Sequence, residues 1–427
     1  MAGFRLSSSA SITTTELGVL LRSDLGTFQL EGRDIQLFTK EILPLLDGTR
    51  DREAIADALG GYSRQSIFAF LDLLEHHKLI EVVSATLGSQ PQARWQGQED
   101  FFRKWTDKPE NLIGKLNKAR ILIVGLEPWG IVAATELAAA GVSSLHLLDD
   151  GNVTQNDLLL VRTWKSEYLG LSRCQALAEA LAENAPWCHV TSGSPKVSDD
   201  RRLILDDIEW DLVIGATTSD DLLLLQSLAR FAHKAGITSL FCHLEGLDAF
   251  VGPAVIPGQT ACWNCCRLRQ LANSDHPQAA HALQTSLLSA RPQSRTRTYL
   301  APMASVAGHL LALEALKLIA GYTPSNLAGR LLVQNLVTLE TTFHAVIRMP
   351  WCEVCGGASS GGIPFGGPAL GTQKPKKSLQ ELDKIDDPGN LREKLAGWVD
   401  DHTGIIRYLM IDTPLLAFGK AISTVPH

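Results

Sequence analysis

Two widely separated Cys-x-x-Cys pairs constrain the fold of this chain more than any other feature. The first pair is Cys262 and Cys265, and the second is Cys352 and Cys355. Each pair spaces two thiolates so that one tetrahedral cation can bind both, and four thiolates complete the coordination of Zn²⁺. Such a site has no open position for water, so it supports structure and does not catalyse. We therefore expect one structural zinc site that joins two distant segments.

The other cysteines leave alternatives open. Cys266 directly follows the first pair and could compete as a ligand, and disulfide bonds or thiols in a reduced core are alternatives to a metal. Cys174, Cys188 and Cys242 lie in apolar segments and are expected to be buried thiols. The N-terminus lacks the apolar core of a signal peptide. We therefore expect the cysteine pairs in a reducing, cytoplasmic setting.

Composition excludes two classes of partner. The net charge of -7 argues against general nucleic-acid binding. No uninterrupted apolar run of about 18 residues occurs, so no membrane span is expected. The length of 427 residues suggests two or three domains. The expected division is a recognition unit (1–84), a connector with aromatic anchors (85–118), an α/β domain (119–355), a linker rich in Gly, Pro and Ser (356–379) and a short remnant (380–427).

Local patterns predict the elements of the two main units. Residues 16–84 contain two strand candidates around a turn at Asp24–Gly26, then three short helices, as in a winged-helix module. The third helix begins near Ser63 and has one apolar face. Residues 119–260 alternate strands and helices, which predicts an α/β fold with a doubly wound, Rossmann-like parallel sheet. Residues 271–300 are polar and predict a mobile excursion.

The loop after the first strand of the α/β domain departs from a nucleotide-binding pattern. A dinucleotide or ATP site needs G-x-G-x-x-G here, and the chain has GLEPWG from Gly125 to Gly130. Glu127 replaces the middle glycine, where its carboxylate would repel phosphate, and Pro128 removes one N–H donor. We expect a degenerate loop that needs only its two glycines for packing. The alternative is an intact NAD or ATP site, with Asp149 or Asp150 holding a ribose hydroxyl.

The α/β domain and its cysteine pairs resemble the ThiF/MoeB superfamily of ubiquitin-activating proteins. The segment AGVSSLHLLDDGNVTQND carries the likeness, and Asp150, Val153 and Asn156 keep part of the family motif. The Arg-Gln pair expected after Asn156 is absent, and the family's lysine is matched at best by Arg173. The resemblance therefore implies a retained scaffold with the adenylating machinery lost. ATP is not expected in this chain, and relatives of this kind commonly form homodimers.

The N-terminal unit resembles the PqqD-like RiPP recognition element, through EILPLLDGTRDREAIADAL and SIFAFLDLLEHHKLIEVV. In that family a leader peptide adds to the small sheet as an extra strand beside the third helix. Carried over, this implies a peptide-binding edge and a helix wall formed by Thr27, Phe28, Gln29, Leu30 and Glu31, with Gln65, Phe68 and Asp72. A winged-helix interaction or dimerisation module is the alternative.

The two units together resemble the leader-binding C component of azole-forming cyclodehydratases, the thiazole/oxazole-modified microcin (TOMM) pathways. The segment LREKLAGWVDDHTGIIRYL also resembles the start of a YcaO domain. The implied function is a subunit, not an enzyme on its own, that binds a precursor's leader and presents the precursor to a YcaO partner. The alternative is an ATP-dependent ThiF-like enzyme that adenylates a peptide or carrier-protein carboxylate. A Rossmann oxidoreductase is the least supported hypothesis, because such an enzyme does not account for the four cysteines.

Overall fold

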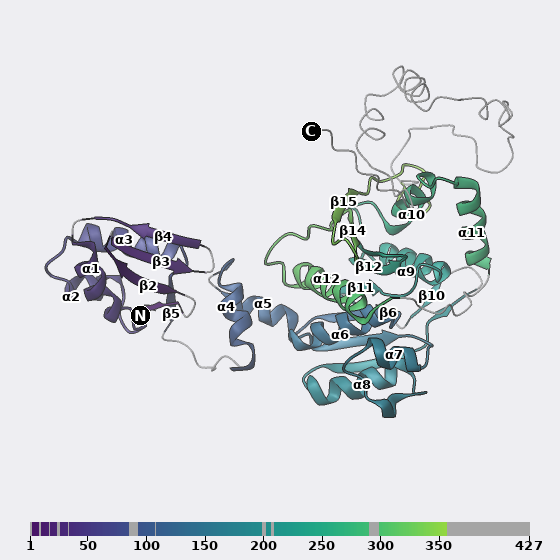
Figure 1. Cartoon of the computed structure of the whole chain (residues 1–427), viewed down its shortest axis with the longest axis horizontal. Helices are drawn as coiled ribbons and strands as arrows, with labels where there is room; N and C mark the ends of the chain where they lie inside the picture. The colour runs from purple at the N-terminus through teal and green to yellow at the C-terminus, as the bar shows by residue number, and fades with distance from the viewer. Residues whose placement is uncertain are drawn as a thin grey trace, which may run out of the picture.

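The computed structural model describes residues 2–356, except 8–9, 17, 24–25, 33, 85–92, 107, 199–201, 206–208 and 290–298. Most of the expected linker and all of the expected YcaO-like remnant therefore lie outside the described residues. Figure 1 shows a small N-terminal unit joined through short helices to a larger α/β body.

The N-terminal unit is built on two small antiparallel sheets. One has the order β2-β3-β4, and the other pairs β1 with β5. The strands are β1 (Ala2–Leu6), β2 (Ser11–Thr15), β3 (Gly18–Ser23), β4 (Gly26–Leu30) and β5 (Ile80–Ser84). The expected β3–β4 hairpin is present, whereas β1 and β2 were not predicted from the Ser- and Thr-rich N-terminus.

Three helices cover these sheets. They are α1 (Ile35–Ile42), followed by the 3-10 turn η1 (Leu43–Leu45), α2 (Arg52–Ala58) and α3 (Arg64–His76). Asp51 caps α2 and Ser63 caps α3, because each side chain accepts a hydrogen bond from a backbone N–H three residues later. The apolar face of α3 is buried with Val19 and Leu21 of β3 in a core that belongs to this unit.

The connector is largely helical. It contains η2 (Ala93–Trp95), α4 (Gln96–Phe102) and α5 (Pro109–Leu116). Trp95 and Phe102 are buried in the core of the α/β body, as anchors should be. Phe101 and Trp105 remain 42% and 45% exposed, so only part of the expected anchoring is found.

The α/β body contains one eight-stranded sheet of order β15-β14-β13-β12-β11-β6-β7-β8. Its strands are β6 (Arg120–Val124), β7 (Ser144–Leu148), β8 (His189–Gly193), β11 (Leu212–Gly215), β12 (Ser239–Glu245), β13 (Asp248–Val255), β14 (Arg330–Asn335) and β15 (Thr341–Ala345). The stretch from β12 to β8 is parallel, but β13, β14 and β15 are antiparallel. The expected parallel sheet is therefore found from β12 to β8, and the expectation is wrong for β13. Two residues separate β12 from β13, and so short a connection permits only antiparallel pairing.

Helices cover both faces of this sheet (Figure 1). They are α6 (Pro128–Ala139), α7 (Gln155–Leu160), α8 (Arg173–Asn184), α9 (Leu222–Lys234), α10 (Trp263–Ala272), α11 (Pro277–Ser289) and α12 (Ala301–Ala320), with η3 (Ser166–Tyr168) and the short strands β9 (Lys196–Val197) and β10 (Leu203–Ile204). Ile121 and Ile123 of β6 pack with α6, α8 and α12, whereas Leu122 and Val124 pack with α9. Burial on both faces explains why this strand is almost entirely apolar.

Two helices bear on earlier expectations. α11 occupies residues 277–289, so the segment 271–300 is not the wholly irregular excursion expected from its polarity. α12 is long and apolar enough, by length and composition, to cross a membrane. It packs against α6, β12 and β13, which is a position that also accounts for an apolar helix.

Candidate functional site

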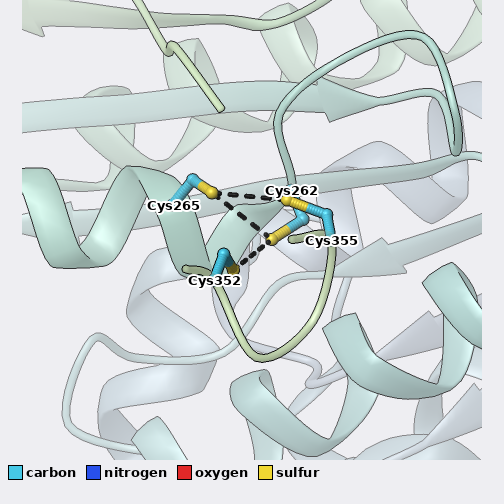
Figure 2. Close-up of side chains that lie close together, drawn as sticks. All are labelled: Cys262, Cys265, Cys352 and Cys355. Atoms are coloured by element: carbon cyan, nitrogen blue, oxygen red, sulfur yellow. Dashed lines mark hydrogen bonds between the residues drawn. The ribbon is translucent and has the colours of Figure 1, made fainter. Parts of the chain in front are cut away.

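The four paired cysteines converge at one end of the sheet. Cys262 and Cys265 lie at the start of α10, and Cys352 and Cys355 lie on the loop after β15. Figure 2 shows the four thiols gathered around one point, and all four sulfur atoms lie within 4.8 Å of one another. The β14–β15 hairpin brings the second pair to the first.

The spacing of these thiols can be tested against a metal. The Cys262–Cys352 and Cys265–Cys355 sulfur pairs are 3.5 and 3.4 Å apart, and the Cys262–Cys265 pair is 3.9 Å apart. Tetrahedral zinc with Zn–S bonds of about 2.3 Å places its sulfurs roughly 3.8 Å apart. The donor set and its spacing therefore fit a four-thiolate metal site.

Nearby groups favour a thiolate at Cys352, whereas hydrogen bonds within the cluster and burial raise the pKa values of the Cys262 and Cys265 thiols. Hydrogen bonds with Cys262 and Cys265 lower the pKa of the Cys352 thiol, despite its burial. Asn264 Nδ2 also lies 3.5 Å from Cys352 Sγ, and Met349 N donates to Cys265 Sγ over 3.4 Å. Donors of this kind stabilise negative sulfur and orient metal ligands.

The remaining cysteines lie apart from this cluster. Cys266 packs with Phe250 on β13 and Leu331 on β14, and burial raises the pKa of its thiol to about 12. Burial also raises the pKa values of Cys174 and Cys188, each to about 11. High thiol pKa values suppress the reactive thiolate, so these cysteines have the properties of structural thiols.

The glycines of the degenerate loop fit tightly against the neighbouring strand end. Gly125 has φ +90°, and a Cβ there would lie 2.6 Å from Thr217 Cβ. A Cβ on Gly130 would lie 2.7 Å from Gly125 O and 2.9 Å from Ala216 Cβ. Packing and backbone conformation alone therefore account for both glycines.

Glu127 takes part in a buried charge cluster that sequence reasoning missed. It lies at the N-terminus of α6, is 4% exposed, and places Oε1 3.4 Å from an Nη atom of Arg173. Arg173, on α8, also donates to both carboxylate oxygens of Asp157 at 3.1 and 3.2 Å. Asp149 Oδ1 lies 3.9 Å from the same guanidinium. Burial would lower the pKa of Arg173, but Glu127, Asp149 and Asp157 outweigh it and raise that pKa.

The two aspartates after β7 have different environments. Asp149 accepts hydrogen bonds from the N–H groups of Leu126 and Gly151, each at 2.8 Å, so it fixes the loop itself. Asp150 is exposed. Trp129 is 1% exposed and donates from Nε1 to Cys242 O at 3.1 Å. Side chains of this chain therefore pack around the loop. In the sequence, only Glu127 in place of the middle glycine indicated this packing.

The expected peptide-binding residues lie on two parts of the N-terminal unit. Thr27 to Leu30 belong to β4, which is an edge strand in the described part of its sheet, and Glu31 follows it. Phe28 lies 3.9 Å, ring to ring, from His77, directly after α3.

The expected helix wall lies on another flank of α3. Gln65 is exposed, Asp72 forms an ion pair with Arg52 of α2 at 2.6 Å, and Phe68 lies beneath the same guanidinium. Because 3.6 residues make one helical turn, Asp72 and His77 project about 140° apart. The Phe28–His77 ring contact therefore joins β4 to the side of α3 that faces His77, which is not the side that carries Asp72.

Comparisons with known proteins agree with this architecture. The ThiF family model matches residues 103–354. The molybdopterin-synthase adenylyltransferase of Escherichia coli is 28% identical over 244 residues, or 56% of this chain and 88% of that protein. The sulfur carrier protein ThiS adenylyltransferase of the same organism is 25% identical over 248 residues, or 58% and 89%.

Solved structures extend the likeness beyond the family match. A crystal structure of E. coli MccB with MccA-N7isoASN has a TM-score of 0.66 at 17% identity, covering 84% of this chain and 100% of that one. The microcin C7 biosynthetic enzyme MccB in complex with N-formylated MccA has a TM-score of 0.66 at 16% identity, covering 83% and 100%. The part of this chain that each MccB structure covers is longer than residues 103–354. The common fold therefore includes residues outside that range.

Proposed function

This chain belongs to the ThiF family, and on that premise we propose that it binds a peptide substrate without adenylating it. The substrate is the leader of a ribosomally made precursor, held at β4. The chain presents the precursor to a YcaO cyclodehydratase, which forms the azoline or azole rings. Holding the leader raises the effective concentration of the core peptide at the partner's active site.

The buried Arg173 cluster carries the proposal. Three carboxylates against one guanidinium give these four side chains a net charge of -2, next to the loop where relatives of this fold accept phosphates. Glu127 places its own carboxylate at the N-terminus of α6, the position that favours a bound anion. A triphosphate would have to displace this carboxylate or share the site with it.

Two observations support a peptide partner. β4 offers an unpaired edge in its described sheet, and extended peptides bind such edges through main-chain hydrogen bonds. The similar MccB structures contain MccA, and MccB is a microcin biosynthetic enzyme. Binding of a microcin-type precursor by this chain is proposed from that likeness.

The four converging cysteines would hold a structural Zn²⁺. The ion would join the start of α10 to the loop after β15, and it takes no part in chemistry because all four positions are filled by thiolates. A cytoplasmic location, where thiols stay reduced, and a homodimer are parts of the same proposal.

An adenylyltransferase is the second candidate, because the curated relatives named above carry that activity in their names. ATP–pyrophosphate exchange and calorimetry with MgATP distinguish the two, with the E. coli molybdopterin-synthase adenylyltransferase as the positive control. We expect no exchange and no saturable heat with this chain. Micromolar affinity for MgATP would contradict the non-adenylating proposal.

The edge-strand proposal is tested with proline in β4. In an edge strand, alternate N–H groups point toward the neighbouring strand and toward the open edge. One of the two variants Phe28→Pro and Gln29→Pro therefore removes an N–H donor at the open edge. The probe is a synthetic leader peptide from any small Cys/Ser/Thr-rich reading frame found beside the gene. We expect both variants to lose binding, while Thr13→Pro on the opposite edge strand β2 keeps it. Wild-type affinity in both β4 variants would refute capture at this edge.

A further inference from the structure

Two buried amide side chains connect α9 to the cysteine cluster. Gln226 lies on α9, and Asn264 lies on α10 inside the first Cys-x-x-Cys pair. Gln226 is 9% exposed and Asn264 is 5% exposed. Their sequence neighbours Leu225 and Trp263 belong to the apolar core that also contains Cys352. Amides at this place lose their hydration, so each needs a partner inside the protein.

The two amides form a chain of hydrogen bonds that ends at a sulfur atom. Gln226 Nε2 donates to Asn264 Oδ1 over 3.5 Å. Asn264 Nδ2 in turn donates to Cys352 Sγ, also over 3.5 Å. An N–H group that donates to a thiolate stabilises its negative charge, and a buried chain of hydrogen bonds polarises its members. Asn264 therefore acts on the Cys352 sulfur, and Gln226 sets the orientation of the Asn264 amide.

The outer amide of this chain is only partly satisfied. Gln226 Oε1 is buried and has no hydrogen-bond partner among the described residues. A buried acceptor without a partner costs free energy, which an apolar side chain of similar size would avoid. Packing alone therefore does not account for glutamine at position 226, whereas the need to orient Asn264 does.

Other contacts hold the second cysteine pair in place. Arg348 lies on the loop after β15, ahead of that pair, and donates from Nη2 to Gly258 O at 3.0 Å and to Thr260 O at 3.1 Å. These carbonyls belong to the loop that leads into α10. Arg230 of α9 forms an ion pair of 2.8 Å with Glu353, inside the second pair. The position of the loop and the electronic state of the sulfur at the end of the amide chain thus depend on different side chains.

We propose that Asn264, oriented by Gln226, is the positioning residue that tunes the metal bound by the four cysteines. Its amide orients the Cys352 sulfur and withdraws electron density from the bond between that sulfur and the ion. Cys265 has a main-chain donor, Met349 N, at 3.4 Å, so Cys352 is a sulfur that a side chain controls. This inference rests on the proposed metal site and extends it beyond the four thiols.

The test loads the reduced, metal-free, full-length protein with Co²⁺. Co²⁺ bound by thiolates absorbs light through electron transfer from sulfur to the metal. A donated hydrogen bond holds the sulfur electrons more tightly, so its loss should move this band to longer wavelength. Asn264→Leu keeps the size of the side chain and removes the donor, and we expect this shift. Its Zn²⁺ affinity, measured by competition with a chromophoric chelator, should fall about 10- to 100-fold.

Three further variants isolate the hydrogen bond. Gln226→Leu keeps the donor and removes only its orienting partner, so the band should shift in the same direction by less. Asn273→Leu, the same exchange at the exposed end of α10, should change neither the band nor the affinity. Arg348→Gln loosens the loop without removing a donor to sulfur, so its band should stay at the parent position.

The outcomes separate this inference from the metal site itself. An Asn264→Leu protein with the parent's band would overturn the inference, even if its affinity fell, because loosening of the loop alone gives that pattern. If Asn264→Leu does not fold, Gln226→Leu decides by the same band, and an unshifted band there would overturn the inference. A parent protein that binds no Co²⁺ would defeat the metal site and this inference together, whereas a parent that binds it with variants that match it would defeat this inference alone.

Discussion

Arg173 is the residue on which the degenerate loop from Gly125 to Gly130 depends. Its guanidinium lies against the carboxylates of Glu127, Asp149 and Asp157, and its side chain is 9% exposed. Removing one partner from a buried charge cluster leaves the others uncompensated in a medium of low polarity. The cluster therefore holds α6, α7, α8 and the end of β7 in one arrangement.

This dependence predicts the effect of Arg173→Met. The variant should unfold with a free energy about 3–5 kcal/mol lower, because a buried positive partner of three carboxylates is removed. Urea denaturation measures the change. Arg162→Met, an exposed exchange near the end of α7, is the control and should stay within about 0.5 kcal/mol of the parent. An Arg173 variant as stable as that control would show that the cluster does not stabilise the fold.

His243 predicts a pH dependence. Its pKa is lowered from 6.5 to about 3 in the folded state, so the unfolded chain binds this proton first as pH falls. The contribution of neutral His243 to the free energy of unfolding is complete above pH 6.5. It is lost as pH falls toward 3, by up to about 1.4 kcal/mol per pH unit. His243→Phe should lose less stability than the parent between pH 7 and pH 5. Parallel stability curves for the two proteins would contradict the buried neutral ring.

At the scale of elements, the cysteine cluster links α10 to the loop after β15. Cys352→Ser should abolish binding of the proposed metal and increase amide hydrogen exchange in α10 and β15, because structural zinc contributes directly to folding. Metal analysis of the full-length protein and hydrogen exchange measure both effects. Cys266→Ser, buried next to the first pair but outside the cluster, should keep the metal. One zinc per chain in the Cys352 variant would refute the four-thiolate site.

Elements with strong local signals were predictable. Ser63 and the apolar face of α3 predicted that helix. The apolar run from Ile121 to Val124 predicted a strand covered on both faces. Elements whose stability comes from pairing were not. β1 (AGFRL) and β2 (SITTT) are short sequences with little apolar alternation, and they become strands because β5 and β3 provide partners. α11 has largely exposed side chains, so its apolar pattern was weak.

The candidate sites were predictable to different degrees. The cysteine spacing identified all four members of the cluster, because a Cys-x-x-Cys pair has few other uses. The Arg173 cluster was missed because its members are spread from position 127 to 173, and only folding brings α6, β7, α7 and α8 together.

For the whole molecule, the N-terminal unit and the α/β body have separate cores. An ion pair of 3.9 Å between Arg103 and Glu81 is a described contact between the connector and that unit. A chelator should therefore lower the melting transition of the α/β body and leave the N-terminal transition and leader affinity unchanged. Calorimetry with and without chelator checks this. A joint shift of both transitions would mean that the two units fold as one.

The placement of the cysteines has a further consequence for the intact chain. The two pairs stand at either end of residues 262–355, so a bound ion would close this stretch into a ring. A protease nick anywhere between Cys265 and Cys352 would then leave both fragments tethered, and they would part only when the ion was stripped away.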